Sequence, residues 1–236
     1  MSDPGCAPFV LRIASYNIQK CIGTDLRRKP ARVLKVLDAL QADIVTLQEA
    51  DKRLPPRPAA LPAHLLLEHG WQVVPLGGAA SLGWHGNAIL FRGDISLTLT
   101  QRLSLPGLEP RGAALAEFDT PLGPLRVVGL HLGLIAQWRR RQLHMLMRQT
   151  APRDPVPTIW AGDFNDWDRS PLLDRAAPAM NFLPALPSFP APAPLAPLDR
   201  IALSPDLRAL RHGVHGIRPA KTASDHLPLW AEITRA

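Results

Sequence analysis

The chain has 236 residues, of which 46% are hydrophobic, and it carries 27 Lys and Arg against 20 Asp and Glu. This length and apolar content exclude wholesale disorder and predict a single domain over residues 1–236, with a core from about residue 10 to 234. The formal net charge of +7 suits a polyanionic partner such as nucleic acid, an acidic lipid surface or a phosphate ester, although a composition rich in Arg, Ala and Pro also accompanies a GC-rich genome.

Membrane and disulfide signals are both weak. No stretch approaches the roughly 18 apolar residues of a membrane helix. The start MSDPGCAPFV lacks a basic region followed by an apolar one. Cys6 and Cys21 are too few for a disulfide framework. We therefore expect a soluble protein of the reducing cytoplasm, without a transmembrane segment.

The N-terminal part of the chain alternates strands and helices. Residues 10–18 alternate in period two and predict a strand that ends at Asn17. Pro30 suits the first turn of a helix, which is indicated by apolar residues at helical spacing, namely Val33, Leu34, Leu37 and Leu40. The nearly continuous apolar stretch 43–51 predicts a strand with Glu49 at its end.

The middle of the chain is rich in strands. A proline-rich loop is expected over 51–62, followed by a short helix over 61–71 that is closed by Gly70. Successive strands are then expected over 71–76, 86–92, 95–103, 111–119 and 124–132. The turn TPLGP joins the last two of these strands as a hairpin.

Residues 135–150 predict a second long helix. Its candidate core residues are Trp138, Leu143, Leu146 and Met147. The opposite face carries Arg139, Arg140 and Arg141, which we expect to be solvated.

The C-terminal part adds strands over 156–164, 198–204 and 225–233. The proline-rich segment 178–197 predicts a loop that lies over the core without regular structure. Many strands with few helices indicate an α/β or α+β fold, which two packed sheets covered by helices would accommodate.

Polar side chains stand where the apolar strands end. They are Asn17, Glu49, His131, the cluster Asp163, Asn165, Asp166 and Asp168, and Asp199; the pair Asp225 and His226 precedes the last strand. Each residue alone has an ordinary explanation as a turn, cap or core residue. Six such groups in one chain predict a ligand site at one rim of the sheets.

The residue types at this rim restrict the chemistry. The chain has no GxSxG, no recognisable Cys–His nucleophile motif and no glycine-rich phosphate loop. Glu49, Asp225 and the Asn17 amide are hard oxygen ligands, which suit Mg²⁺ or Mn²⁺ better than Zn²⁺. A hard cation with nearby imidazoles and carboxylates is the equipment for attack by water on phosphorus.

The ordered motifs SYNI, LQEAD, GNAIL, LHLG, GDFNDW, LDRI and SDHLP resemble those of the endonuclease/exonuclease/phosphatase superfamily, the DNase I-like metal-dependent phosphoesterases. The resemblance extends from about Arg12 to Ile233, and the chain is similar to a compact bacterial branch of this superfamily. It implies a four-layered sandwich, with two central mixed β-sheets flanked by helices and an active site at the strand ends on one edge.

The resemblance also implies roles for single residues. Glu49 would be the principal metal ligand, with Asn17 and Asp225 completing or bordering the metal site. Asp163 would position or activate the attacking water, and Asn165 would hold the phosphate and Asp163 in place.

The histidines would serve the same step. His226 would contact the phosphate or act as the base, oriented by Asp199, and His131 would stabilise the phosphoryl charge; the division between Asp163 and His226 stays open. Weaker matches suggest substrate-binding residues at Asn87, Arg111 and Phe189, and Phe189 serves equally well as a loop anchor.

One departure from the family pattern concerns the metal. Many relatives carry His, Asp or a similar polar group after SYNI, whereas this chain has Gln19 and Lys20. An acidic residue that could serve as a second metal ligand is therefore absent there, so we expect one tightly held metal. The resulting hypothesis is a Mg²⁺-dependent phosphodiesterase or phosphomonoesterase, with Mn²⁺ as a substitute and nucleic acid as the first substrate. A phospholipid or inositol-phosphate headgroup is the alternative. A catalytically silent binding protein on the same fold is disfavoured because every matched position is chemically intact.

Overall fold

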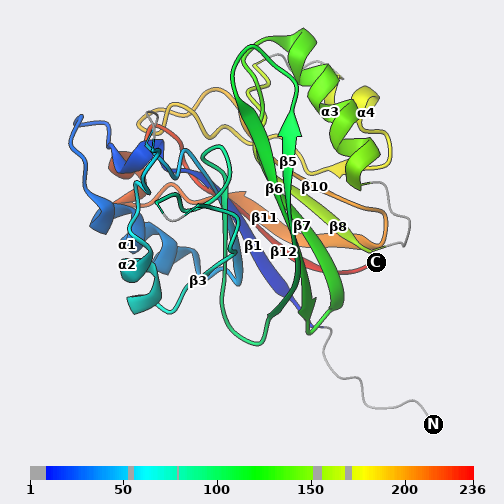
Figure 1. The fold of residues 1–236 in the computed structure, drawn as a ribbon, viewed down its shortest axis with the longest axis horizontal. Coiled ribbons are helices and arrows are strands. Elements are labelled where there is room, and N and C mark those ends of the chain that lie inside the picture. The colour runs from blue at the N-terminus through cyan, green and yellow to red at the C-terminus, as the bar shows by residue number, and fades with distance from the viewer. Residues whose placement is uncertain (1–8, 53–55, 79, 151–155, 168–171) are drawn as a thin grey trace.

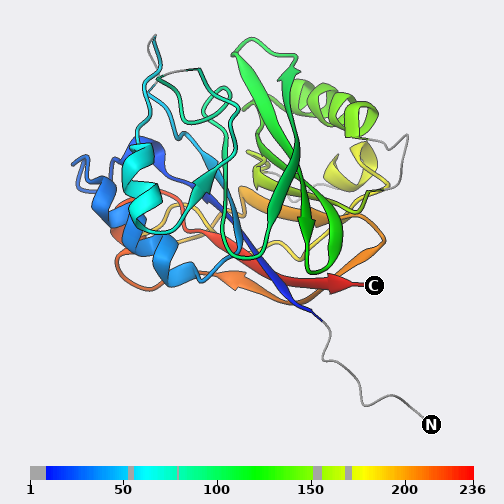
Figure 2. The ribbon, with the colours of Figure 1, turned by 60° about the horizontal axis from the view of Figure 1, so that its bottom comes forward.

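The computed structural model describes residues 9–52, 56–78, 80–150, 156–167 and 172–236. Two six-stranded sheets pack face to face, and helices cover their outer surfaces, which makes four layers (Figures 1 and 2). The predicted four-layered sandwich with two mixed sheets is confirmed. No helix within these residues is long and apolar enough to cross a membrane.

The first sheet has the order β11-β12-β1-β2-β4-β3. Its strands are β1 (Leu11–Asn17), β2 (Ile44–Gln48), β3 (Gln72–Val73), β4 (Ala88–Phe91), β11 (Leu207–Val214) and β12 (Leu229–Arg235). The second sheet has the order β5-β6-β7-β8-β10-β9. Its strands are β5 (Ser96–Leu105), β6 (Arg111–Thr120), β7 (Gly123–His131), β8 (Thr158–Asp163), β9 (Asn181–Phe182) and β10 (Asp199–Leu203).

The helices lie on the outside of the two sheets. They are α1 (Pro30–Leu40), α2 (Ala63–Glu68), α3 (Ala136–Thr150), α4 (Leu172–Ala176), α5 (Ala220–Ala223) and the 3₁₀ turn η1 (Gln19–Cys21). In Figure 1, α1 and α2 flank the first sheet, and α3 and α4 flank the second.

Period two in the strands divides the apolar side chains between separate cores. On β1, Ile13 joins the core between the sheets, whereas Ala14 and Tyr16 join the core beneath α1. On β8, Ile159 faces the other sheet and Trp160 packs under α3 and α4. Both faces of the central strands are therefore buried, which explains their nearly continuous apolar sequences.

Parallel pairing places polar residues at one edge. β1 pairs in parallel with β2, with Asn17 opposite Gln48, so Glu49 follows at the same edge. β7 pairs in parallel with β8, with His131 opposite Asp163. The antiparallel β10 begins at this edge with Asp199, which is also opposite Asp163. Three of the predicted site residues thus lie in one row across the second sheet.

The arginines of α3 differ from the sequence prediction. Arg140 and Arg141 are exposed, as expected, but Arg139 is only 2% exposed. Its guanidinium donates a hydrogen bond of 2.7 Å to the Leu134 carbonyl and pairs with buried Asp166 at 3.4 Å. The prediction of a solvated Arg139 is wrong because this side chain neutralises a buried carboxylate beneath the helix.

The core face of α3 is narrower than predicted. Leu143 and Leu146 are fully buried, and Met147 packs partly buried against them. Trp138 is half-buried, with the Arg141 guanidinium 4.8 Å from its ring centroid. The prediction that Trp138 belongs to the core is therefore wrong. Its ring lies at the surface, where it makes a cation–π contact with Arg141.

Strand β11 was missed by the sequence analysis. Its side chains are mostly exposed or half-buried, and a bulge between Ala209 and Arg211 breaks the alternation. The strand expected over 71–76 shortens to β3. Within the loop 178–197, only β9 and the bridge between Phe189 and Ala196 are regular.

Candidate active site

A cavity of about 370 Å³ opens at the edge where the parallel strands end. Seven of the predicted site residues line it, namely Asn17, Glu49, Arg111, His131, Asp163, Asn165 and His226. They come from both sheets and from the loops that follow their strands. Much of the predicted rim therefore lines one concave site, whereas Asp199 and Asp225 are not among the residues that line it.

Asp163 is the most constrained carboxylate of this cavity. One oxygen accepts a hydrogen bond of 3.1 Å from the Asn17 side-chain amide, across the space between the two sheets. The other accepts the Asn165 backbone N–H at 2.9 Å. The Asn165 amide in turn donates to the Leu132 carbonyl at 2.9 Å. These bonds hold the buried Asp163 carboxylate rigidly at the end of β8.

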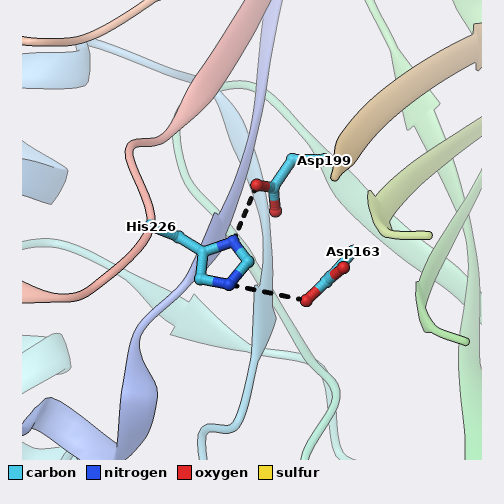
Figure 3. A group of neighbouring side chains, drawn as sticks. All are labelled: Asp163, Asp199 and His226. Atoms are coloured by element: carbon cyan, nitrogen blue, oxygen red, sulfur yellow. Dashed lines mark hydrogen bonds and ion pairs between the residues drawn. The ribbon is translucent and has the colours of Figure 1, made fainter. Parts of the chain in front are cut away.

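His226 lies between two carboxylates (Figure 3). Its Nδ1 is 2.8 Å from Asp199 Oδ2, and its Nε2 is 3.8 Å from Asp163 Oδ2. The Ser188 hydroxyl donates to the same Asp199 oxygen at 2.6 Å. This arrangement fixes the ring with Nε2 toward Asp163, so the predicted His226–Asp199 pair is present in the structure.

The proline-rich loop supports this pair. It supplies Ser188, and it also supplies Phe189, whose ring centroid is 5.0 Å from that of His226 and 5.6 Å from that of Trp167. Phe189 packs against the His226 ring and is not among the residues that line the cavity. The loop therefore lies over His226 and holds the imidazole and its carboxylate partner in place.

Burial and neighbouring charges shift the pKa values of the titratable groups of the site in different directions. Burial would lower the pKa of His226, but Asp199, Asp163 and Asp225 raise it to about 10. Burial, followed by Asp199, raises the pKa of Asp163 to about 7, against the lowering effects of His226, Asn165 and Asn17. At neutral pH, His226 is therefore a cation and Asp163 is close to its midpoint.

His131 is the neutral imidazole of the site. Its Nε2 is 3.4 Å from Asp163 Oδ2, on the neighbouring parallel strand. Burial lowers the pKa of His131 well below its usual value, and Arg111, His226 and Lys20 lower it further. A neutral ring keeps one N–H donor without adding a charge.

Two other carboxylates belong to the predicted metal site, and of these Glu49 lines the cavity whereas Asp225 does not. Glu49 has a left-handed φ of 53° directly after β2, and its carboxylate pairs with the Lys20 ammonium. Burial raises the pKa of Asp225, and Glu49 raises it further, so the two carboxylates repel each other. The Asn17 amide oxygen, which accepts the Gln19 N–H at 3.1 Å, keeps a second lone pair. This set of hard oxygens fits a divalent cation.

Asp163, Asp199 and His226 form a second acidic group. Their ligand atoms lie within 4.8 Å of one another, and all three residues are buried. The short bond between His226 and Asp199 already occupies Nδ1 of the ring. This group therefore has the geometry of an oriented imidazole as well as that of a cation site.

The remaining predicted residues lie at different depths. Arg111 lines the cavity and pairs with Glu109 at 2.7 Å. Asn87 is fully buried, donates to the Gly112 carbonyl at 2.8 Å and is not among the residues that line the cavity. Asp166 turns toward Arg139, and Asp168 lies outside the described residues.

One part of the cavity wall is formed by residues that the sequence did not predict. Lys52, Arg57, His85 and Glu109 line the cavity from loops that carry no strand-end or motif signal. Lys20, noted only as a departure from the family pattern, also lines it. Their approach to the site depends on loop packing, which no local pattern of residues reveals.

Facing sheets with a polar cavity at their carboxyl edge define a DNase I-like α/β sandwich. Residues 14–226 match the model of the endonuclease/exonuclease/phosphatase family, and the chain belongs to that family. It is 31% identical to the uncharacterized protein YbhP of Escherichia coli K12 over 95% of this chain and 96% of YbhP.

Solved structures agree on the fold. The mannosyl-6-phosphatase Bt3783 of Bacteroides thetaiotaomicron superposes with a TM-score of 0.71 at 19% identity, over 95% of this chain and 99% of that one. The D. rerio TDP2 complexed with a single-strand DNA product superposes with a TM-score of 0.68 at 17% identity, over 95% and 99% of the two chains. At this identity the likeness shows the fold alone.

Proposed function

We propose that this protein is a divalent-metal-dependent phosphoesterase that hydrolyses phosphodiester bonds. Nucleic acid is the first candidate substrate. The observation that carries the proposal is the His226 ring, held by Asp199 at 2.8 Å and facing Asp163 in a cavity that Glu49 also lines. Phosphoryl hydrolysis needs three kinds of group, and the site offers all of them. They are a cationic imidazole, a carboxylate whose pKa lies near the working pH, and a separate pair of acidic side chains.

Glu49 would hold the cation, with Asp225 and the Asn17 oxygen beside it. The Lys20 ammonium now pairs with Glu49, so it would have to leave that carboxylate when a cation binds. Mg²⁺, with Mn²⁺ as a substitute, would withdraw charge from the phosphoryl oxygens and so favour attack.

The protein's own groups would carry the proton chemistry. Asp163 would accept a proton from the attacking water, because a base whose pKa lies near the working pH is the most effective. Protonated His226 and the N–H of neutral His131 would stabilise the charge on the phosphoryl oxygens. The new P–O bond forms as the ester P–O bond breaks, and the leaving oxygen takes up a proton from solvent water to depart as an alcohol.

The test is a substrate panel with Mg²⁺, Mn²⁺ or excess EDTA. It would contain single- and double-stranded DNA, RNA, inositol phosphates, phospholipid vesicles and p-nitrophenyl phosphate. Turnover of nucleic acid with Mg²⁺ supports the proposal, and turnover only of headgroup esters supports the alternative. No turnover of any ester, with a folded protein, contradicts phosphoesterase activity.

His226 and Asp199 should act as one unit. We expect His226→Ala to lower kcat by about 10² to 10⁴. The double variant with Asp199→Asn should be little worse, because Asp199 acts by orienting the imidazole that His226→Ala has already removed. Steady-state kinetics of the four proteins measure the coupling. The matched control is the exposed pair of His69 and Asp38, 2.9 Å apart, whose removal should leave kcat unchanged. Multiplicative losses at the first pair would show independent residues.

The pH profile should have two limbs. Activity should rise as Asp163 deprotonates, with an apparent pKa of about 7, because a base must be unprotonated. It should fall as His226 deprotonates, with an apparent pKa of about 10. Both values belong to the interacting group, so kcat/KM measured from pH 5 to 11 is the appropriate readout. A profile that is flat between about pH 6 and 8 would contradict Asp163 as the base.

A further inference from the structure

The loop-built part of the cavity wall carries cations that the proposed chemistry does not use. Lys52 and Arg57 lie on the segment after β2, and His85 lies on the segment before β4. Backbone hydrogen bonds tie these segments side by side, with Ala59 N–H donating to the Ala80 carbonyl at 2.7 Å and Ala50 N–H to the Gly86 carbonyl at 2.9 Å. The two loops run together in Figures 1 and 2. They present their polar side chains to the same cavity as Asp163 and His226.

Arg57 is held by an unusual partner. Its Nη1 is 3.0 Å from His85 Nδ1. A guanidinium only donates hydrogen bonds, so Nδ1 must be the acceptor and the His85 ring must be neutral. Burial lowers the pKa of His85, and Arg57 lowers it further, which agrees with this assignment. His85 therefore orients Arg57 without neutralising its charge.

Carboxylates elsewhere on the wall have other partners. Glu109 pairs with Arg111, and Glu49 pairs with Lys20. The Asp51 oxygens accept the Ser81 hydroxyl at 2.6 Å and the Leu82 N–H at 2.7 Å.

Within the described part of the chain, neither Arg57 nor Lys52 pairs with a carboxylate. An unneutralised guanidinium that faces a cavity is a binding group for an anion.

The backbone at both members of the pair is strained. Arg57 has a φ of 54° and His85 a φ of 50°, in the left-handed region that non-glycine residues avoid. The other left-handed non-glycine residues that line the cavity are Lys20, Glu49 and Asn165, which belong to or touch the proposed catalytic groups. Such strain clusters at ligand-binding positions, where the fold holds a side chain in a required direction.

We propose that Arg57, positioned by His85 and supported by Lys52, binds a second anionic group of the substrate. The preferred substrate is then a phosphate ester that carries another phosphate close to the scissile one. This inference rests on the proposed function, because it takes the scissile phosphate to lie at Asp163 and His226. A cavity of about 370 Å³ lies in the range of small-ligand pockets, so both anions belong to one compact ligand or to adjacent positions of one strand end.

Matched substrate pairs test the inference. Thymidine 5′-(p-nitrophenyl phosphate) is compared with the same compound bearing a 3′-phosphate, and inositol monophosphate with inositol bisphosphate. Wild type should have a KM about tenfold lower for the member that carries the second phosphate. Arg57→Ala should remove that difference while kcat changes less than about twofold, and Arg57→Lys should restore part of it. The pair that shows the effect distinguishes a nucleotide from a polyol source.

The controls separate this inference from the proposed function. Arg208→Ala, at an exposed position on β11, should leave both KM values unchanged. His85→Ala should raise KM for the substrate that carries the second phosphate without lowering kcat. Equal KM values for both members in wild type, or an Arg57→Ala effect of the same size on both, would overturn the inference and leave the proposed function intact.

If neither pair is hydrolysed, calorimetry with pyrophosphate and inorganic phosphate decides. Arg57→Ala should then weaken pyrophosphate binding about tenfold and phosphate binding much less. Equal affinity of wild type and Arg57→Ala for pyrophosphate would overturn the second anion site, independently of any activity.

Discussion

Glu49→Gln should abolish turnover, with kcat falling by about 10³ or more, because it removes the anionic oxygen that a hard cation needs. Glu49 stands directly after β2 and lines the cavity, and its backbone is held in a left-handed conformation. Excess EDTA should have the same effect on the wild-type protein. The measurements are steady-state kinetics over a Mg²⁺ titration and calorimetry of Mn²⁺ binding, which reports the site without catalysis.

The control for Glu49→Gln is Glu68→Gln, at an exposed position on α2, which should retain wild-type kcat and Mn²⁺ affinity. Circular dichroism should show the same fold for both variants. A folded Glu49→Gln protein with wild-type turnover, or wild-type turnover in excess EDTA, would refute the metal site proposed here.

Asp163→Asn should lower kcat by about 10² to 10⁴, the contribution of a typical general base. The substitution preserves the size of the side chain but removes the charge that would accept the proton of water. KM should change little, because a carboxylate repels a phosphate in the ground state and its loss cannot weaken that contact. Kinetics on the substrate that the panel identifies measure both quantities.

Two observations complete the Asp163 experiment. Asp206→Asn, at an exposed position, is the matched control and should behave as wild type. In Asp163→Asn, the amide must accommodate the Asn17 and Asn165 donors, so a melting curve has to confirm that the variant is folded. A folded variant with wild-type kcat would mean that the carboxylate serves only to tie the two sheets together.

Most of the strands, and the residue types at their ends, can be read from the amino-acid sequence alone. Alternating or continuous apolar stretches report burial directly, so β1, β2, β7, β8 and β10 were predicted close to their observed positions. The ordered motifs along the chain then predicted the fold and the family, both of which are confirmed. These properties are local or sequential, and they can be read without knowing which strands become neighbours.

Which polar groups meet depends on how the strands pair in the folded chain. Asp163, Asp199 and His131 share a row because of the pairing register of β7, β8 and β10, which depends on how whole strands pack. β11 escaped prediction because an exposed edge strand with a bulge has no apolar alternation.

The charged side chains depended most on tertiary context. Arg139 turned inward because Asp166 is buried beneath α3, and Arg57 reached the cavity because two loops pack together and His85 holds its guanidinium. The sequence does not show whether a long cationic side chain points toward solvent or toward a buried partner. Its direction is set by the partner that the folded chain brings within reach, and that partner is distant along the chain.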